Sequence, residues 1–448
     1  MIAPAKRRVV VTGLGVVSPF GYGIDALWDA MLEGRSALRR VTAFDPSGFR
    51  CQVAAEARGY RGKDHVPKHY RKAVKVMARD IEIAVGAAKA ATEHAGIVTK
   101  AVAEEGQSLT YDQRRVGCQI GAGLIACEVP ELATAMSTAT QAHAPGEIDY
   151  DAWGETGMHN LTPLWLLKYL PNMLACHVTI LHEAKGPSNP HTCGEASGAL
   201  SIGESLRVIQ RGDADCCFSG GAESKINPMG MIRMGYVGQT GAIEAPEGDD
   251  DTTYESAIRP YDARSQGGAL GEGGGIAILE AKETADARGE RTLAELVGFG
   301  AAQSFLGDDP AIIGRGLELS ITRALSDAGI SPGDIDAIVP LATGSPRYDE
   351  AEAIALRKVF GESLANIELL TSSPNIGVAS AGASSLAFAL GVMALHHKSL
   401  PARIHHGEPA PGLCAGAAEQ RDAPLTHVLV CSSAFSGQHG SLVLRSAS

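Results

Sequence analysis

Residues 186–224, "GPSNPHTCGEASGALSIGESLRVIQRGDADCCFSGGAES", contain the pattern that decides the fold: a loop, a helix and then a strand. The helix is rich in Ala, Gly and Ser and has few large side chains. Such a helix can lie in the centre of a domain, with sheets pressed close on both sides. Cys193 and Glu195 are two positions apart where the loop enters this helix, so only one of them can take the position at the helix start.

The second half of the chain repeats this organisation. The small-residue segment "VASAGASSLAFALGVMALHHKSLPA" (378–402) echoes the helix quoted above. Segments 78–124 and 314–344 both run from an amphipathic helix through Ala-Gly-Ile and a spacer to a strand and a glycine turn. We therefore predict a duplicated α/β architecture, with an N-terminal half over residues 1–285 and a C-terminal half over 286–448.

Composition narrows the class of protein. The 448 residues carry a formal net charge of −12, which argues against a general affinity for nucleic acid or anionic membrane. The N-terminus runs directly into an apolar strand without a signal peptide, and no apolar run approaches membrane-spanning length. We therefore expect a cytoplasmic protein without membrane insertion. Segments 101–117, 138–160 and 240–257 are polar or rich in Gly and Pro, which predicts surface insertions.

The sequence predicts neither a metal site nor a cofactor. The nine cysteines show no disulfide or zinc spacing, and the paired histidines at 396–397 and 405–406 have no further residue to complete a ligand set. Gly13-x-Gly15 follows a strand but lacks the third glycine and the later acidic residue of a dinucleotide site. We interpret these glycines as a structural turn.

Several motifs, in the same order along nearly the whole chain, resemble the β-ketoacyl-ACP synthases, the condensing enzymes of fatty-acid and polyketide assembly. They are "RRVVVTGLGVVSPFG", the 186–224 stretch, "RPYDARSQGGALGEGGGIAILE", "SSPNIGVASAGASS" and "CSSAFSGQHGSLVL". The resemblance implies a thiolase-like fold, a duplicated five-layer α/β/α/β/α sandwich that dimerises. It also implies acyltransferase activity with an acyl carrier protein as partner and no cofactor.

Condensation in this family needs a cysteine thiolate at a buried helix N-terminus. The family cysteine lies nine residues after the glycine of the Gly-Pro-Ser turn and twelve before the helix arginine. Counting from Gly186 and from Arg207 leads in both cases to Glu195. Cys193 lies two positions early, in the loop, and is the alternative nucleophile.

Two histidines assist malonyl decarboxylation in the family and bind the thioester enolate. The first falls at Leu341 or Ala342 here; Ala342 is the assigned equivalent, and neither residue is a histidine. The second is replaced by Val378. The C-terminal turn that donates an N–H to the oxyanion survives in part, which assigns substrate binding to Phe435 and Gly437. Glu272 is expected to remain as a buried structural acid.

Glu195 itself is expected to be a poor catalyst. Unpaired N–H groups at a helix start stabilise a carboxylate, so we expect a low pKa and weak nucleophilicity. The negative charge would also repel an incoming malonyl group.

Three hypotheses follow from the substituted triad. In the first, the chain is a non-condensing subunit that shapes an acyl tunnel for an intact ketosynthase, similar to chain-length factors, although those typically carry Gln at this position. In the second, it is an enzyme with altered acyl-thioester chemistry, either an acyltransferase or a decarboxylase, that uses Glu195 or Cys193. In the third, it is a non-enzymatic, carrier-binding homodimer, which a closed acyl pocket would favour. Decarboxylating homologues keep their histidines, which favours the first hypothesis.

Two segments bear on a partner. Family members dimerise through an edge strand of the central sheet, and the apolar run 213–223 is predicted to be that strand. The stretch 162–178, rich in Leu, Trp and Tyr, lines a partner's acyl tunnel or forms an ordinary core helix; both interpretations remain open.

Overall fold

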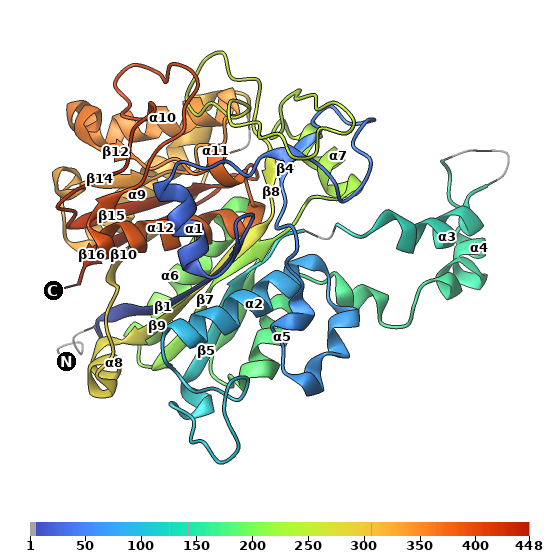
Figure 1. Cartoon of the computed structure of the whole chain (residues 1–448), viewed down its shortest axis with the longest axis horizontal. Coiled ribbons are helices and arrows are strands. Elements are labelled where there is room, and N and C mark those ends of the chain that lie inside the picture. Colours follow the sequence, from blue (N-terminus) through green and yellow to red (C-terminus); the bar gives the residue numbers. More distant parts are fainter. Residues whose placement is uncertain (1–5, 125, 142–143, 145, 306, 448) are drawn as a thin grey trace.

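The computed structural model describes residues 6–124, 126–141, 144, 146–305 and 307–447. One large mixed sheet runs through it, and the first half of its strand path comes from the N-terminal part of the chain (Figure 1). In spatial order these strands are β1 (Val9–Ser18), β9 (Gly273–Ala281), β7 (Cys216–Glu223), β5 (Val116–Gly121) and β6 (Ser188–His191).

The C-terminal part builds the rest of the sheet in the same order. Strand β10 pairs antiparallel with β1 and joins the two parts. Its strands are β10 (Ala294–Gln303), β16 (Gln438–Ser446), β15 (His427–Ser433), β11 (Ala337–Val339) and β12 (Glu368–Leu369). Each part contributes five strands to this path. Numbered by their order along the chain within each part, they lie side by side in the order first, fifth, fourth, second and third, and both parts have the same order, as an internal duplication requires.

Helices cover both halves of the sheet and fill the space between them. Helices α6 (Ser197–Gln210) and α12 (Ala383–His397) contact strands of both halves and each other, so they form a central layer. One outer layer contains α2 (Arg79–His94) and α5 (Met173–His182); the other contains α9 (Pro310–Ala328) and α10 (Pro346–Phe360). The order helix, sheet, helix, sheet, helix can be followed across Figure 1.

The central helix that follows Glu195 is buried, as its small side chains predicted. Gly198, Ala199, Gly203 and Ser205 are among its buried residues. The backbone of β5 lies very close to its first turn: a Cβ added at Gly121 would meet the carbonyl carbon of Ser197 at 2.5 Å. Small residues therefore set the separation between the sheet and the helix that positions Glu195.

Replacing Gly121 by alanine is expected to lower the free energy of unfolding by about 1–3 kcal/mol, because the added methyl group overlaps backbone that cannot rotate away. Urea denaturation measures the change. Gly48→Ala is the matched control, since nothing lies within 4 Å of its added Cβ. Equal stability of the two variants would contradict the close packing of β5 on α6.

Two predictions about the strands were wrong. Gly13 and Gly15 do not form a turn, because β1 continues to Ser18; a Cβ at Gly15 would meet the carbonyl oxygen of Ala87 at 1.9 Å, so these glycines let α2 approach the strand. The run 213–223 is not an edge strand. Its β7 pairs with β9 on one side and β5 on the other, which explains why Cys216, Cys217 and Phe218 are buried.

The edge of the N-terminal half is β6, which pairs only with β5 among the described residues. Ser188, Asn189 and Pro190 of this strand are exposed.

Helices α3 (Val129–Ala139) and α4 (Tyr150–Glu155) pack on each other and stand off from the body at the right of Figure 1. Leu164, Leu166 and Leu167, in the chain that returns from these helices to α5, are exposed, so this part of the 162–178 stretch is not a core helix.

The remaining elements are short. They are α1 (Ile24–Leu32), α7 (Pro228–Tyr236), α8 (Lys282–Arg288), α11 (Ser373–Ile376), β2 (Gly21–Tyr22), β3 (Arg39–Arg40), β4 (Val53–Ala55), β8 (Leu270–Gly271), β13 (Ser399–Leu400) and β14 (Arg421–Asp422). No helix in the described part of the chain has both the length and the apolar character needed to cross a bilayer.

Candidate active site

Glu195 lies in a short 3-10 turn, Gly194–Ala196, that leads directly into α6. Its side chain is only 4% exposed. One carboxylate oxygen accepts a hydrogen bond from the side-chain amide of Gln239, and the other accepts the backbone N–H of Phe435 at 3.3 Å. The hydroxyl groups of Ser384 and Ser432 donate to its backbone carbonyl at 2.8 and 2.7 Å. The residue is therefore held on both its side chain and its backbone.

The expectation of a low pKa for Glu195 was wrong. Burial raises the pKa of this carboxyl, and the hydrogen bonds from Gln239 and Phe435 offset the effect only in part. The expectation rested on free N–H groups at the helix start, but loss of hydration outweighs them at a fully enclosed site. The buried site therefore favours the protonated form of Glu195 more than a solvent-exposed helix start would. A protonated carboxylic acid is also a poor nucleophile.

Leu341 and Val378 line small cavities, whereas Ala342 lies in an apolar cluster. Leu341 lines two small cavities, one of about 20 Å³ that it shares with Phe435 and one of about 10 Å³ that it shares with Val378. Ala342 is fully buried and packs in an apolar cluster with Tyr261. The structure thus brings Leu341 to the spaces beside Phe435 and Val378.

Cys193 is half-buried and precedes the turn that contains Glu195. Its backbone N–H donates to the Ser197 hydroxyl at 2.8 Å, and burial raises the pKa of its thiol. A thiol with a raised pKa supplies little thiolate at neutral pH, which disfavours Cys193 as a nucleophile.

Gly437 has a φ of +87° and donates its N–H to the carbonyl of Ala434, closing the turn that presents the Phe435 N–H.

Sequence reasoning missed two buried carboxylates, Asp349 and Glu352. Glu352 accepts the N–H groups of Leu341 and Ala342 at 3.0 and 2.9 Å, which holds Ala342 at an unusual φ of +47°. Asp349 accepts the N–H of Tyr261 at 2.9 Å and that of Gly344. Their spacing of three residues in "YDEAEA" places both on one face of α10, and that spacing was the available signal.

Stability is expected to depend on pH through Asp349. Burial raises its pKa from 3.8 to about 7, so the folded protein keeps a proton that the unfolded chain releases. This contribution is complete at low pH and is lost as the pH rises from about 4 to about 7. Relative to Asp349→Asn, the wild-type free energy of unfolding should fall by up to about 4 kcal/mol over that range. Urea denaturation at a series of pH values measures it, and parallel curves for the two proteins would contradict the assignment.

A third buried group that sequence reasoning missed is Lys225, in the loop between β7 and α7. Its side chain forms an ion pair with Glu223, and its ammonium donates to the carbonyl of Leu124 at 2.6 Å. The opposite carboxylate oxygen of Glu223 accepts the N–H of Ala381 at 2.8 Å. This pair therefore ties β7 to the loop before α12. The apolar run of β7 gave no signal of a buried lysine just beyond its end.

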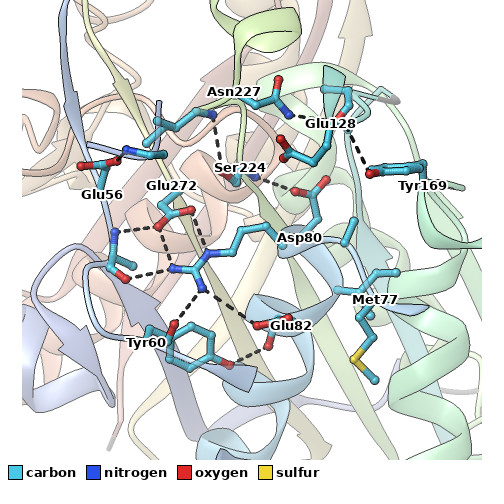
Figure 2. A pocket seen from close by; sticks show the side chains of 18 of the residues that line it. Glu56, Tyr60, Met77, Asp80, Glu82, Glu128, Tyr169, Ser224, Asn227 and Glu272 are labelled. Carbon is cyan, nitrogen blue, oxygen red and sulfur yellow. Dashed lines mark hydrogen bonds and ion pairs between the residues drawn. The ribbon is translucent and has the colours of Figure 1, made fainter. Parts of the chain in front are cut away.

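A larger cavity, of about 660 Å³, lies near the base of the α3–α4 projection (Figure 2). Glu56, Asp80, Glu128 and Glu272 are among its lining carboxylates, and Met77, Leu170, Leu174 and Ile226 are among its apolar residues. Glu272 is buried, as predicted, and pairs with Arg79 at 2.8 Å. The described residues contain no group of three or more His, Cys, Asp or Glu side chains that could hold a metal ion.

Two family models match the chain. The model described as Beta-ketoacyl synthase, N-terminal domain, matches residues 6–285, and Beta-ketoacyl synthase, C-terminal domain, matches residues 293–406. The chain is also 30% identical over 442 residues to 3-oxoacyl-[acyl-carrier-protein] synthase 2 of Coxiella burnetii (strain RSA 493 / Nine Mile phase I), with 98% of each chain covered. The chain belongs to the β-ketoacyl synthase family. The predicted thiolase-like fold is therefore confirmed.

Solved β-ketoacyl synthase structures agree in fold. The ishigamide ketosynthase/chain length factor superposes with a TM-score of 0.79 at 26% identity and covers 99% of this chain and 100% of its own. A β-ketoacyl synthase from Burkholderia phymatum STM815 gives a TM-score of 0.79 at 24% identity, with the same coverage. The chain is also 28% identical over 443 residues to the 3-oxoacyl-[acyl-carrier-protein] synthase 2 of Staphylococcus aureus (strain COL), with 98% of each chain covered.

Proposed function

We propose that this β-ketoacyl synthase relative is a non-condensing subunit that acts beside an intact ketosynthase, in the manner of a chain-length factor. The observation that carries the proposal is the contact between Glu195 and Phe435. In the family the Phe435 N–H would receive the thioester oxyanion, but here it donates to the buried carboxylate of Glu195. The oxyanion site is thus occupied by the chain's own side chain.

The other two positions support the same function. Decarboxylation of a malonyl group needs a side chain that transfers a proton or donates a hydrogen bond. The side chains at the two histidine positions, Leu341 or Ala342 and Val378, can do neither. The raised pKa of Cys193 disfavours the displaced thiol as a substitute nucleophile. An altered acyltransferase or decarboxylase would therefore have to work without a histidine at either family position, with a thiol whose pKa is raised, and with the oxyanion donor already bound to Glu195.

The partner we propose is a ketosynthase that retains its cysteine and histidines, together with an acyl carrier protein. One solved relative is itself a ketosynthase/chain length factor, and a curated relative is named 3-oxoacyl-[acyl-carrier-protein] synthase 2. The exposed edge strand β6 is where we place the pairing with this partner, since no strand of the described residues pairs with its outer side. The exposed leucines 164, 166 and 167 offer a second apolar surface for a partner.

Co-expression with a ketosynthase encoded beside this chain tests the partnership. We expect the two chains to co-purify and to run as one species of about twice the mass of a single chain. Enlarging side chains within residues 162–177 should then change the length of the acyl product. Failure to co-purify, together with an unchanged product length, would contradict the proposed partnership.

A carrier-binding homodimeric scaffold is a second candidate, because the cavities that Leu341 lines beside Phe435 and Val378 are small. Their volumes of about 20 and 10 Å³ are too small for an acyl chain. The two candidates differ in composition: the scaffold pairs β6 with a second copy of this chain and needs no ketosynthase. Native mass spectrometry of the co-expressed proteins distinguishes a homodimer from a mixed dimer.

A further inference from the structure

A serine and a histidine meet at the end of the C-terminal part of the sheet. Ser433 is the last residue of β15 and His439 lies in β16, where the antiparallel register pairs the two residues directly. The hydroxyl of Ser433 lies 2.9 Å from Nδ1 of His439. Both residues line the cavity of about 20 Å³. His439 is 1% exposed and Ser433 is half-buried, so a partly exposed serine is backed by a buried imidazole.

The hydrogen bonds of Ser304 decide which nitrogen of His439 carries the proton. The Ser304 hydroxyl donates its only proton to the carbonyl of Ile313 at 2.6 Å. It can therefore only accept from His439, whose Nε2 lies 2.8 Å away, so Nε2 carries the imidazole proton. Burial lowers the pKa of His439 to about 4, so the ring is neutral at pH 7. In a neutral ring Nδ1 is then the acceptor, and Ser433 donates its hydroxyl proton to it.

Helix α9 holds the imidazole in this orientation. The N–H of Gly316 donates to the Ser304 hydroxyl at 2.9 Å. A Cβ added at Gly316 would meet Cδ2 of His439 at 2.3 Å, so the missing side chain lets the ring lie close to the helix. A serine hydroxyl that is bonded to a histidine, which a third group orients, is the arrangement of a nucleophile with its general base.

We propose that Ser433 and His439 form a catalytic pair that hydrolyses short activated acyl esters and thioesters. The Ser433 oxygen attacks the acyl carbon and its proton moves to Nδ1 of His439. The bond from the acyl carbon to the leaving oxygen or sulfur then breaks, and the leaving group takes that proton. Water hydrolyses the acyl-serine, again with His439 as the base, and releases the carboxylic acid and the free hydroxyl.

The cavity sets the size of the acyl group. A volume of about 20 Å³ holds about one water molecule, and a methyl group is of similar size. The acyl group is therefore acetyl-sized, and longer acyl chains are excluded. This activity goes beyond the proposed non-condensing function and needs no partner chain.

Hydrolysis of p-nitrophenyl acetate by the isolated chain tests the pair. Ser433→Ala should lower the rate at pH 7 at least about tenfold, since a positioned acid–base group contributes about 10²–10⁴-fold. After an acid quench, fragmentation of the tryptic peptide 422–445 should locate an acetyl group on Ser433. Ser436→Ala is the matched control and should leave the rate unchanged, because Ser436 is exposed and its hydroxyl bonds to Gln438 instead of a histidine.

Two further comparisons separate catalysis from a structural hydrogen bond. His439→Gln should also lower the rate at least about tenfold. If that variant does not fold, Ser433→Ala and the acetyl location decide. p-Nitrophenyl hexanoate should react at least about tenfold more slowly than the acetate. A wild-type rate for Ser433→Ala, acetylation only at other residues, or equal rates for the two esters would overturn the proposal. The assay contains neither a partner nor a malonyl group, so its outcome is independent of the proposed non-condensing function.

Discussion

Lys225→Met is expected to lower the free energy of unfolding by about 3–5 kcal/mol, the usual cost of removing one member of a buried ion pair. Glu223 is 1% exposed and would keep its negative charge in the interior without a cation. Asp80 and Glu195 would lose a favourable interaction with the same ammonium. No comparable penalty arises where a lysine reaches solvent.

Urea denaturation at pH 7 measures this loss. Lys89→Met is the control, because Lys89 forms a partly solvent-accessible ion pair with Glu93 one helical turn away, at 2.6 Å. That change should stay within about 0.5 kcal/mol. If Lys225→Met costs no more than Lys89→Met, Lys225 does not compensate the buried carboxylates.

The second large effect concerns catalysis. We expect Glu195→Cys to gain the ability to take an acyl group from an acyl thioester, because a thiol then occupies the start of α6 and the Phe435 N–H is released for the oxyanion. We expect no condensation with malonyl carrier protein from the same variant. Leu341 and Val378 supply no acid, base or enolate donor, and each such group contributes about 10²–10⁴-fold.

Intact-mass analysis after incubation with acyl and malonyl carrier proteins measures both steps. The variant should gain one acyl mass, while the carrier protein should show no β-ketoacyl product. Glu195→Gln is the control, because it keeps the shape of the glutamate side chain and places no thiol at residue 195. This variant should gain no acyl mass. Condensation by Glu195→Cys would show that residues other than the two family histidines perform the decarboxylation.

The centre of the fold was predictable from the sequence because its determinants are local. The small residues of 197–210 predicted a buried central helix, and the ungapped counts from Gly186 and Arg207 assigned Glu195 to its start. The recurring helix and strand order predicted the duplicated architecture.

The features that were mispredicted depend on contacts between distant segments. The burial of Cys216 and Phe218 fits an inner strand as well as a covered edge, and only the pairing of β7 with β5 and β9 decides between them. Burial raises the pKa of Glu195, and hydrogen bonds from Gln239 and Phe435, which are far away in sequence, lower it in part.

A condensation assay on carrier protein tests the central claim most directly. It compares this chain alone, the chain with its co-expressed ketosynthase, and the chain with a ketosynthase whose nucleophilic cysteine is changed to alanine. We expect β-ketoacyl carrier protein only in the second sample, and no loss of that product when Glu195 of this chain is changed to Gln. Formation of β-ketoacyl carrier protein by this chain alone would contradict the account.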